Sequence, residues 1–240
     1  MRKVFATLTG ERNMYVTLSS ERPPAFIKSD IAAPFRTKVT SLSPRRHEAG
    51  THLFREGDDA DYIYEIKSGI VRLTRVLENG RRQVIAFGLP GEIIGFPNGD
   101  HHHTDCDVIA TAQIVAHRRW SLETGGGDLE THERLLRAAL REITAMQDHF
   151  MMLARKSAVE KVASFLMVLS QRTGTPSGNY TTVPLPMSRA DIADFLGLTV
   201  ETVCRSFTLL RKNGAIMLIT PQTVVIHDMQ ALIDASQDAE

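Results

Sequence analysis

The stretch between positions 128 and 155 contains neither glycine nor proline. It is rich in leucine, arginine, alanine, glutamate and methionine, and this composition predicts one uninterrupted helix. At 1.5 Å per residue the helix is roughly 42 Å long, which is more than a small domain needs. Any fold of this chain must therefore accommodate a helix that extends past the domain beside it.

Apolar side chains recur along this helix at alternating spacings of three and four residues. They are Leu136, Ala139, Ile143, Met146, Phe150 and Leu153. This spacing resembles the seam of a coiled coil and indicates a homodimer. The alternative is that the stripe packs on the chain's own preceding domain.

The segments on either side of the helix differ in composition. At roughly 150 residues per domain, 240 residues suit one large domain or two modest ones. Residues 1–40 are interrupted by prolines and predict a mostly irregular extension. Residues 41–127 predict a β-roll, and residues 156–240 predict a second domain of short helices and strands. The helix of residues 128–155 lies between these two domains in the sequence.

The roll is predicted from short stretches of β-branched and aromatic residues that alternate with glycines. We expect strand cores at 63–66, 70–73 and 84–87, with Asn79-Gly80 in a hairpin turn. Many short strands in about 70 residues are typical of a small barrel or roll.

Charge and cysteine content exclude several classes of protein. Basic and acidic side chains number 28 each, so any affinity for nucleic acid must be local. No segment is apolar enough for a membrane span or a signal core, and we expect a cytoplasmic protein with no membrane partner. Two cysteines, Cys106 and Cys204, provide neither a disulfide framework nor a CxxC metal motif.

The segment from Ser188 to Asn213 has the spacing of a helix-turn-helix. Ser188 can cap a first helix, Gly197 supplies the turn, and Thr199 can cap a second helix. The buried face of the second helix is predicted to contain Val203, Phe207 and Leu210. Two predicted strands follow around Thr220-Pro221, and this context indicates a winged helix-turn-helix.

The outward face of the second helix carries the candidate base-reading residues Val200, Glu201, Cys204 and Arg205. An arginine can donate two hydrogen bonds to guanine, and a glutamate can accept one from cytosine N4 or hold the arginine in place. The alternative is a plain surface ion pair between Glu201 and Arg205. Candidate contacts to the DNA backbone are Ser188, Arg189, Thr199, Thr202 and Lys212.

From about His47 to Met229 the chain resembles the CRP/FNR family of bacterial transcription regulators. The resemblance is carried by EAGTHLFREGDDADYIYEIKSGIVRL and GRRQVIAFGLPGEIIGF in the roll, SAVEKVASFL after the long helix, and DIADFLGLTVETVCRSFTLL in the helix-turn-helix. It implies an α+β fold with a cyclic-nucleotide-binding-type jelly roll, a dimerisation helix and a winged helix-turn-helix. Implied partners are double-stranded DNA, RNA polymerase and a second copy of the chain.

Within that family the helix resembles the FNR and FixK branch, which reads TTG arms by Glu, Ser and Arg. The matching positions are Glu201, Cys204 and Arg205, so cysteine replaces the usual serine. The resemblance implies an activator that binds a TTG-N8-CAA palindrome.

Residues that the family uses to sense ligands are incomplete here. Gly91-Glu92 matches the cyclic-AMP pocket, but residues 97–111 contain no Arg or Lys to bind the phosphate. The family's iron–sulfur switch needs four cysteines, and residues 1–105 contain none. His101-His102-His103 could bind metal or haem, although a polar turn is the plainer interpretation. We expect no cofactor.

The sequence thus favours a FixK-like activator that binds DNA without a small-molecule effector. An effector-gated regulator, with haem or another ligand, is the alternative, and an enzyme is the distant one because no catalytic set has usable spacing. Cys204 is either a tolerated substitute for serine or a thiol whose oxidation blocks DNA binding.

Overall fold

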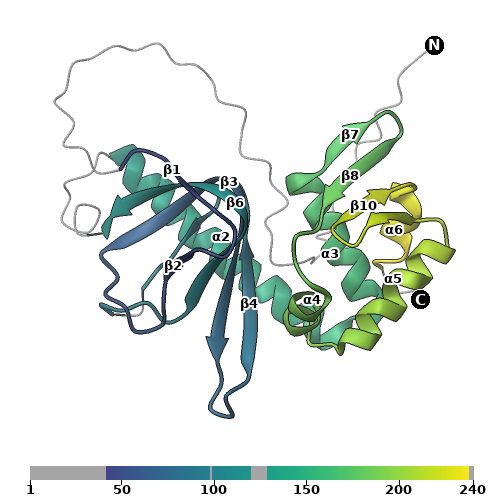
Figure 1. Cartoon of the computed structure of the whole chain (residues 1–240), viewed down its shortest axis with the longest axis horizontal. Coiled ribbons are helices and arrows are strands. Elements are labelled where there is room, and N and C mark those ends of the chain that lie inside the picture. Colours follow the sequence, from purple (N-terminus) through teal and green to yellow (C-terminus); the bar gives the residue numbers. More distant parts are fainter. Residues whose placement is uncertain (1–41, 98, 120–128, 238–240) are drawn as a thin grey trace.

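The computed structural model describes residues 42–97, 99–119 and 129–237 (Figure 1). A β-roll and a mixed unit of helices and strands lie side by side, and the long helix α2 extends from one to the other. The predicted α+β fold class is confirmed. The predicted extension of residues 1–40 and the predicted start of the long helix at residue 128 lie outside the described residues.

The roll is one antiparallel sheet that curls around its own core. Its strands are β1 (Arg45–His47), β2 (His52–Phe54), β3 (Tyr62–Val76), β4 (Arg82–Gly88), β5 (Ile93–Ile94) and β6 (Asp105–Arg118). They follow the order β1-β6-β3-β4, with β2 paired to β6 and β5 paired to β3.

Strand β3 runs through the two segments that the sequence predicts as separate strands. At the junction Gly69 adopts a φ of +83°, and the pairing with β6 shifts register on either side of it. A Cβ at this position would lie 2.4 Å from the carbonyl oxygen of Thr111. Glycine therefore bends one long strand here through a bulge instead of ending it. The predicted hairpin turn is present, with Gly80 at a φ of +75° between β3 and β4.

The long helix α2 (Leu129–Arg155) leads from the roll into the second unit, which contains among its described residues four further helices and a four-stranded sheet. The elements of the second unit are α3 (Ala158–Thr173), β7 (Thr175–Ser177), β8 (Tyr180–Pro184), α4 (Arg189–Leu196), α5 (Val200–Lys212), β9 (Ile216–Thr220), β10 (Thr223–Ile226) and α6 (Met229–Asp234). The sheet has the order β7-β8-β10-β9. None of the helices in the described ranges is long and apolar enough to cross a bilayer.

The apolar core of the second unit continues into the roll. Phe87 on β4 packs against Phe165 on α3 and Phe195 on α4, with ring centroids 6.1 and 5.1 Å apart. Ile70 and Leu89 of the roll belong to the same buried cluster. A separate cluster, which includes Ile66, Val71 and Ile114, fills the interior of the roll. The roll therefore shares one core with α3 and α4 where they meet.

Most of the predicted stripe on α2 faces away from the chain. Leu136 and Phe150 are 61% and 70% exposed, Ile143 and Met146 are also exposed, and Ala139 is half-buried. Leu153 differs from the others because it packs against the chain's own core near Gly197. The side of α2 that faces the protein carries Ala138 and Met152 instead. The chain's own roll therefore leaves the four large side chains from Leu136 to Phe150 uncovered.

His149 connects α2 to α4 and gives the stability of the fold a pH dependence. Its ring stacks on Phe195 with centroids 4.4 Å apart. Burial lowers the pKa of His149 to about 4, and the nearby charge of Lys161 acts in the same direction. Because the unfolded chain binds the proton more readily, stability should fall as the pH decreases from about 6.5 to about 4.

We expect His149→Phe to remove about 1 to 3 kcal/mol of this acid-induced loss. Chemical denaturation of both proteins at pH 7.5 and pH 5 gives the loss of unfolding free energy for each. The difference between the two losses reports His149 alone, because the other titrating groups contribute equally to both proteins. Equal losses in the two proteins would contradict a half-buried His149 that stays neutral against Phe195.

Candidate nucleic-acid interface

The first helix of the predicted helix-turn-helix, α4, begins with a reciprocal cap. The Ser188 hydroxyl accepts a hydrogen bond from the Asp191 backbone N–H at 3.0 Å and donates one to the Asp191 carboxylate at 2.7 Å. The backbone N–H of Ser188 donates to the same carboxylate. This capping box confirms the predicted helix start. It also engages the Ser188 hydroxyl that we expected to contact DNA.

A sharp turn places α5 across α4. Gly197 ends α4 in the left-handed conformation at a φ of +62°, which glycine adopts without strain. Thr199 then begins α5, and its hydroxyl accepts a hydrogen bond from the Thr202 N–H at 3.2 Å. The guanidinium of Arg189 lies 3.9 Å from the centre of the Phe207 ring, which fastens the start of α4 to the middle of α5.

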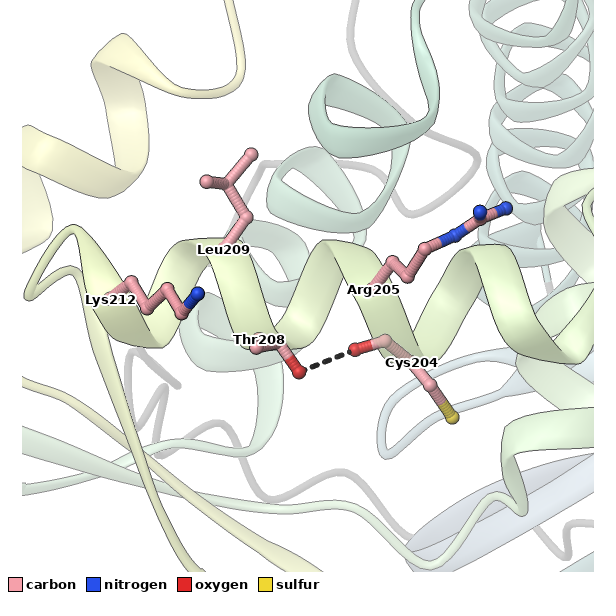
Figure 2. Close-up of a pocket in the computed structure, with 5 residues that line it drawn as sticks. All are labelled: Cys204, Arg205, Thr208, Leu209 and Lys212. Atoms are coloured by element: carbon pink, nitrogen blue, oxygen red, sulfur yellow. Dashed lines mark hydrogen bonds between the residues drawn. The ribbon is translucent and has the colours of Figure 1, made fainter.

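The outward face of α5 is available to a ligand. Val200, Glu201, Cys204 and Arg205 are exposed, whereas Val203, Phe207 and Leu210 are buried against the unit's core. Farther along, a shallow hollow of about 390 Å³ is lined by Cys204, Arg205, Thr208, Leu209 and Lys212 (Figure 2). The predicted base-reading residues and Lys212 therefore lie on one accessible side of one helix.

Thr202, which the sequence suggested as a contact to the DNA backbone, orients Arg205 in the structure. Arg205 Nη2 donates to the hydroxyl of Thr202 at 3.2 Å. Among the ion pairs of the described residues none joins Glu201 to Arg205, so the plain surface ion pair is not formed here. Hydrogen bonds from its own backbone and from Thr199, together with the charge of the nearby Arg205, hold the pKa of the Glu201 carboxyl below its usual range. Glu201 is thus a charged acceptor beside a positioned arginine.

The glutamate that matches the family's ligand-binding position is engaged within the chain. Glu92 Oε1 lies 3.1 Å from Arg172 Nη2 at the end of α3, and Glu92 Oε2 accepts from the Leu89 N–H at 3.0 Å. Arg172 also donates to the carbonyl of Pro90. The Gly91-Glu92 turn therefore contacts the second unit with the carboxylate that a ligand would need.

The three consecutive histidines have different surroundings. His102 is buried and stacks on Phe54 with ring centroids 3.9 Å apart, near Tyr64. His101 is exposed and pairs with Asp59 at 3.2 Å, and His103 is exposed. Within the described part of the chain no group of three or more His, Cys, Asp or Glu side chains could hold a metal ion. His102 acts as an aromatic side chain of the roll.

The two cysteines differ in the same way. Cys106 on β6 is fully buried, and burial raises the pKa of its thiol above the usual range. Cys204 on α5 is exposed. Only Cys204 of the two is open to oxidants or labels in the folded protein.

This arrangement, a capped helix-turn-helix followed by a two-stranded wing and preceded by a jelly-roll domain, defines a class of DNA-binding transcription regulators. Two family models match it. Residues 44–118 match the cyclic nucleotide-binding domain, and residues 160–235 match the Crp-like helix-turn-helix domain.

Named relatives narrow the class. The chain is 34% identical to the nitrogen fixation regulation protein FixK of Azorhizobium caulinodans over 215 residues. The matched stretch covers 89% of this chain and 87% of the relative. It is 40% identical to FixK of Bradyrhizobium diazoefficiens over 82% of this chain and 84% of the relative. The solved structure of FixK2 from Bradyrhizobium japonicum superposes with a TM-score of 0.73 at 32% identity, covering 83% of this chain and all of that one.

The chain belongs to the CRP/FNR family, and its resemblance to FixK is confirmed. It is a DNA-binding transcription regulator and not an enzyme.

Proposed function

We propose that the protein is a homodimeric, FixK-like transcription activator that binds a TTG-N8-CAA palindrome and contacts RNA polymerase in the bacterial cytoplasm. The observation that carries this proposal is the outward face of α5, where Glu201, Cys204 and Arg205 are exposed at the positions of the branch's Glu, Ser and Arg, with cysteine in place of serine. Arg205 reads the guanine of each half-site, and Glu201 accepts from its paired cytosine. Contacts of Ser188, Arg189, Thr199, Thr202 and Lys212 with the DNA backbone position the helix.

The exposed stripe of α2 supports the homodimer. Leu136, Leu140, Ile143, Met146 and Phe150 are all more than half exposed. Side chains of this size rarely line up in water along one helix of a monomer. Two such helices packed around a two-fold axis would cover the stripe. They would place the two copies of α5, which we call the recognition helix, about 34 Å apart, one turn of DNA.

Two features of the roll support binding without a small-molecule effector. The Glu92 carboxylate is already bound to Arg172 and to a backbone amide. The Phe54, Tyr64 and His102 rings pack on one another beside Gly95. The Glu92 carboxylate and the three rings thus already have partners within the chain.

DNA binding by the purified protein tests this proposal. We expect fluorescence anisotropy to show specific binding to a TTG-N8-CAA duplex with no addition, unchanged by cyclic AMP. An ultraviolet-visible spectrum of the same sample tests the alternative, because a Soret band together with binding only in the haem-loaded state would establish an effector-gated regulator.

Cys204 gives a further prediction, because a thiol on the DNA-facing side of α5 can report oxidation as lost binding. A sulfenic or sulfinic group adds bulk and negative charge close to DNA phosphates. We expect peroxide to weaken specific binding by the parent protein and thiol reductant to restore it when oxidation stops at the sulfenate. Cys204→Ser should bind DNA and resist peroxide.

The buried Cys106 supplies the matched control for this experiment. Cys106→Ser should remain as sensitive to peroxide as the parent protein. If peroxide inactivates Cys204→Ser as fast as the parent, Cys204 is only a tolerated substitute for serine.

A further inference from the structure

Four charged side chains join the roll to the first helix of the helix-turn-helix. Arg72 Nη1 on β3 and Arg82 Nη2 on β4 lie 2.7 and 2.9 Å from the same carboxylate oxygen of Asp191 on α4. Arg72 Nη2 also lies 2.9 Å from Asp107 on β6. We call Arg72, Arg82, Asp107 and Asp191 the interdomain ion cluster.

The interdomain ion cluster is largely withdrawn from water and balanced in charge. The side chains of Arg72, Asp107 and Asp191 are only 16%, 13% and 6% exposed, whereas Arg82 is 43% exposed. Two positive charges face two negative ones, and His52 Nδ1 also contacts Asp107. Ion pairs with little exposure are weakly screened and restrict geometry more than surface pairs do. The cluster therefore specifies how α4 lies on β3 and β4.

Asp191 has two functions in this contact. Its carboxylate caps α4 through Ser188, and the same carboxylate receives both arginines. At the other end of α4 the side-chain amide of Gln83 on β4 donates to the backbone carbonyl of Asp194. Roll residues thus bind α4 near both of its ends.

The orientation of α4 is passed on to the recognition helix. Arg189 on α4 stacks over Phe207 on α5, and buried side chains of both helices belong to one core. The orientation of the recognition helix therefore depends on that of α4, and the orientation of α4 depends on its contacts with the roll.

We propose that Arg72 and Arg82 are positioning residues for DNA recognition. By holding Asp191 they fix the helix-turn-helix relative to the roll, so that the two recognition helices of a dimer have a set separation without a bound effector. This inference rests on the proposed dimer and its palindromic site. It adds that a side-chain contact within each subunit sets the half-site spacing that the protein accepts.

Matched substitutions separate positioning from simple loss of charge. Arg72→Gln and Arg82→Gln each remove a contact to Asp191. Arg75→Gln removes the same charge from β3, the strand that carries Arg72. Arg75, however, is more than half exposed and pairs with Glu56, which also belongs to the roll. Arg82 is more exposed than Arg72, so Arg82→Gln provides a second variant if Arg72→Gln destabilises the fold.

The native cysteines allow the separation to be measured without DNA. Cys204 is exposed and Cys106 is buried, so a thiol-specific spin label attaches once per subunit on the recognition helix. We expect electron–electron dipolar spectroscopy to give one narrow distance distribution for the parent protein and for Arg75→Gln. Arg72→Gln and Arg82→Gln should give clearly broader distributions.

A series of DNA duplexes with TTG and CAA arms separated by seven, eight or nine base pairs provides the functional readout. Each added base pair moves one arm by about 3.4 Å and rotates it, so we expect the parent to prefer one spacing by about tenfold. The preference should shrink to under about threefold in the two cluster variants, while their affinity for a single half-site stays at the parent value. A loss through unfolding would instead lower the affinity for every duplex alike.

The outcomes distinguish this inference from the function on which it rests. A parent protein with no dipolar coupling and no preference for a palindrome over a half-site would overturn the proposed dimer. A parent dimer whose distance distribution and spacing preference are retained by Arg72→Gln and Arg82→Gln would overturn the positioning role alone.

Discussion

Replacing Arg205 with alanine should weaken binding to the TTG-N8-CAA palindrome by about 1 to 3 kcal/mol per half-site, hence roughly 2 to 6 kcal/mol for a dimer. The side chain is exposed on α5 and its guanidinium donates to the Thr202 hydroxyl, so it is already oriented on the outward face of the helix in the absence of DNA. Discrimination at the G·C pair of each arm should be lost as well. Titrations against duplexes with each base at that position measure both effects.

Lys212 is the control on the same helix. It is exposed at the end of α5, where a lysine can contact a phosphate but carries no base-specific geometry. We expect Lys212→Ala to weaken binding equally for all sequences and to reduce the salt dependence by about one phosphate contact. If Arg205→Ala shows that uniform pattern instead, Arg205 is a backbone contact.

Replacing both Ile143 and Phe150 with aspartate should dissociate the dimer. Each change removes apolar burial worth roughly 1.5 to 3 kcal/mol and brings like charges together at the stripe. Because both side chains are more than half exposed in the isolated chain, the monomer should keep its fold. Sedimentation velocity should show a folded monomer that binds the palindrome no better than a half-site.

Thr144→Asp controls for an added charge on the same helix. Thr144 is exposed next to Ile143 but lies off the apolar stripe, and its hydroxyl donates only to the carbonyl of Leu140. This variant should sediment as the parent does. An unchanged dimer in the Ile143 and Phe150 variant would refute the stripe as the dimer seam.

Features encoded by neighbouring residues were predictable from the sequence. The caps at Ser188 and Thr199 and the turn at Gly197 depend on side chains within three or four positions, and the structure contains all three. Strand β3 was predicted as two strands because glycine usually interrupts a strand, and its bulge depends on the approach of Thr111 from β6. Leu153 fits the spacing of the stripe, but the end of α2 packs on the core and directs it inward.

Contacts between distant parts of the chain could not be predicted in this way. Arg72 and Asp191 are 119 positions apart, and neither position differs in sequence from an ordinary surface charge. The use of Thr202 to orient Arg205 depends on the rotamer of a long side chain on the folded helix. Composition and periodicity report which residues form an element, whereas these contacts depend on how finished elements meet.

The shared core around Phe87, Phe165 and Phe195 limits how freely the DNA-binding unit, α3 to α6, can be exchanged between relatives. A chimera joined after α2 would place a foreign α3 and α4 against the Phe87 face of this roll. Such a graft would leave cavities or clashes, each of which costs on the order of 1 to 3 kcal/mol. A working hybrid therefore has to include the matching face of β4 together with its new DNA-binding unit. The segment that must be exchanged as a whole is thus larger than the helix-turn-helix that binds DNA.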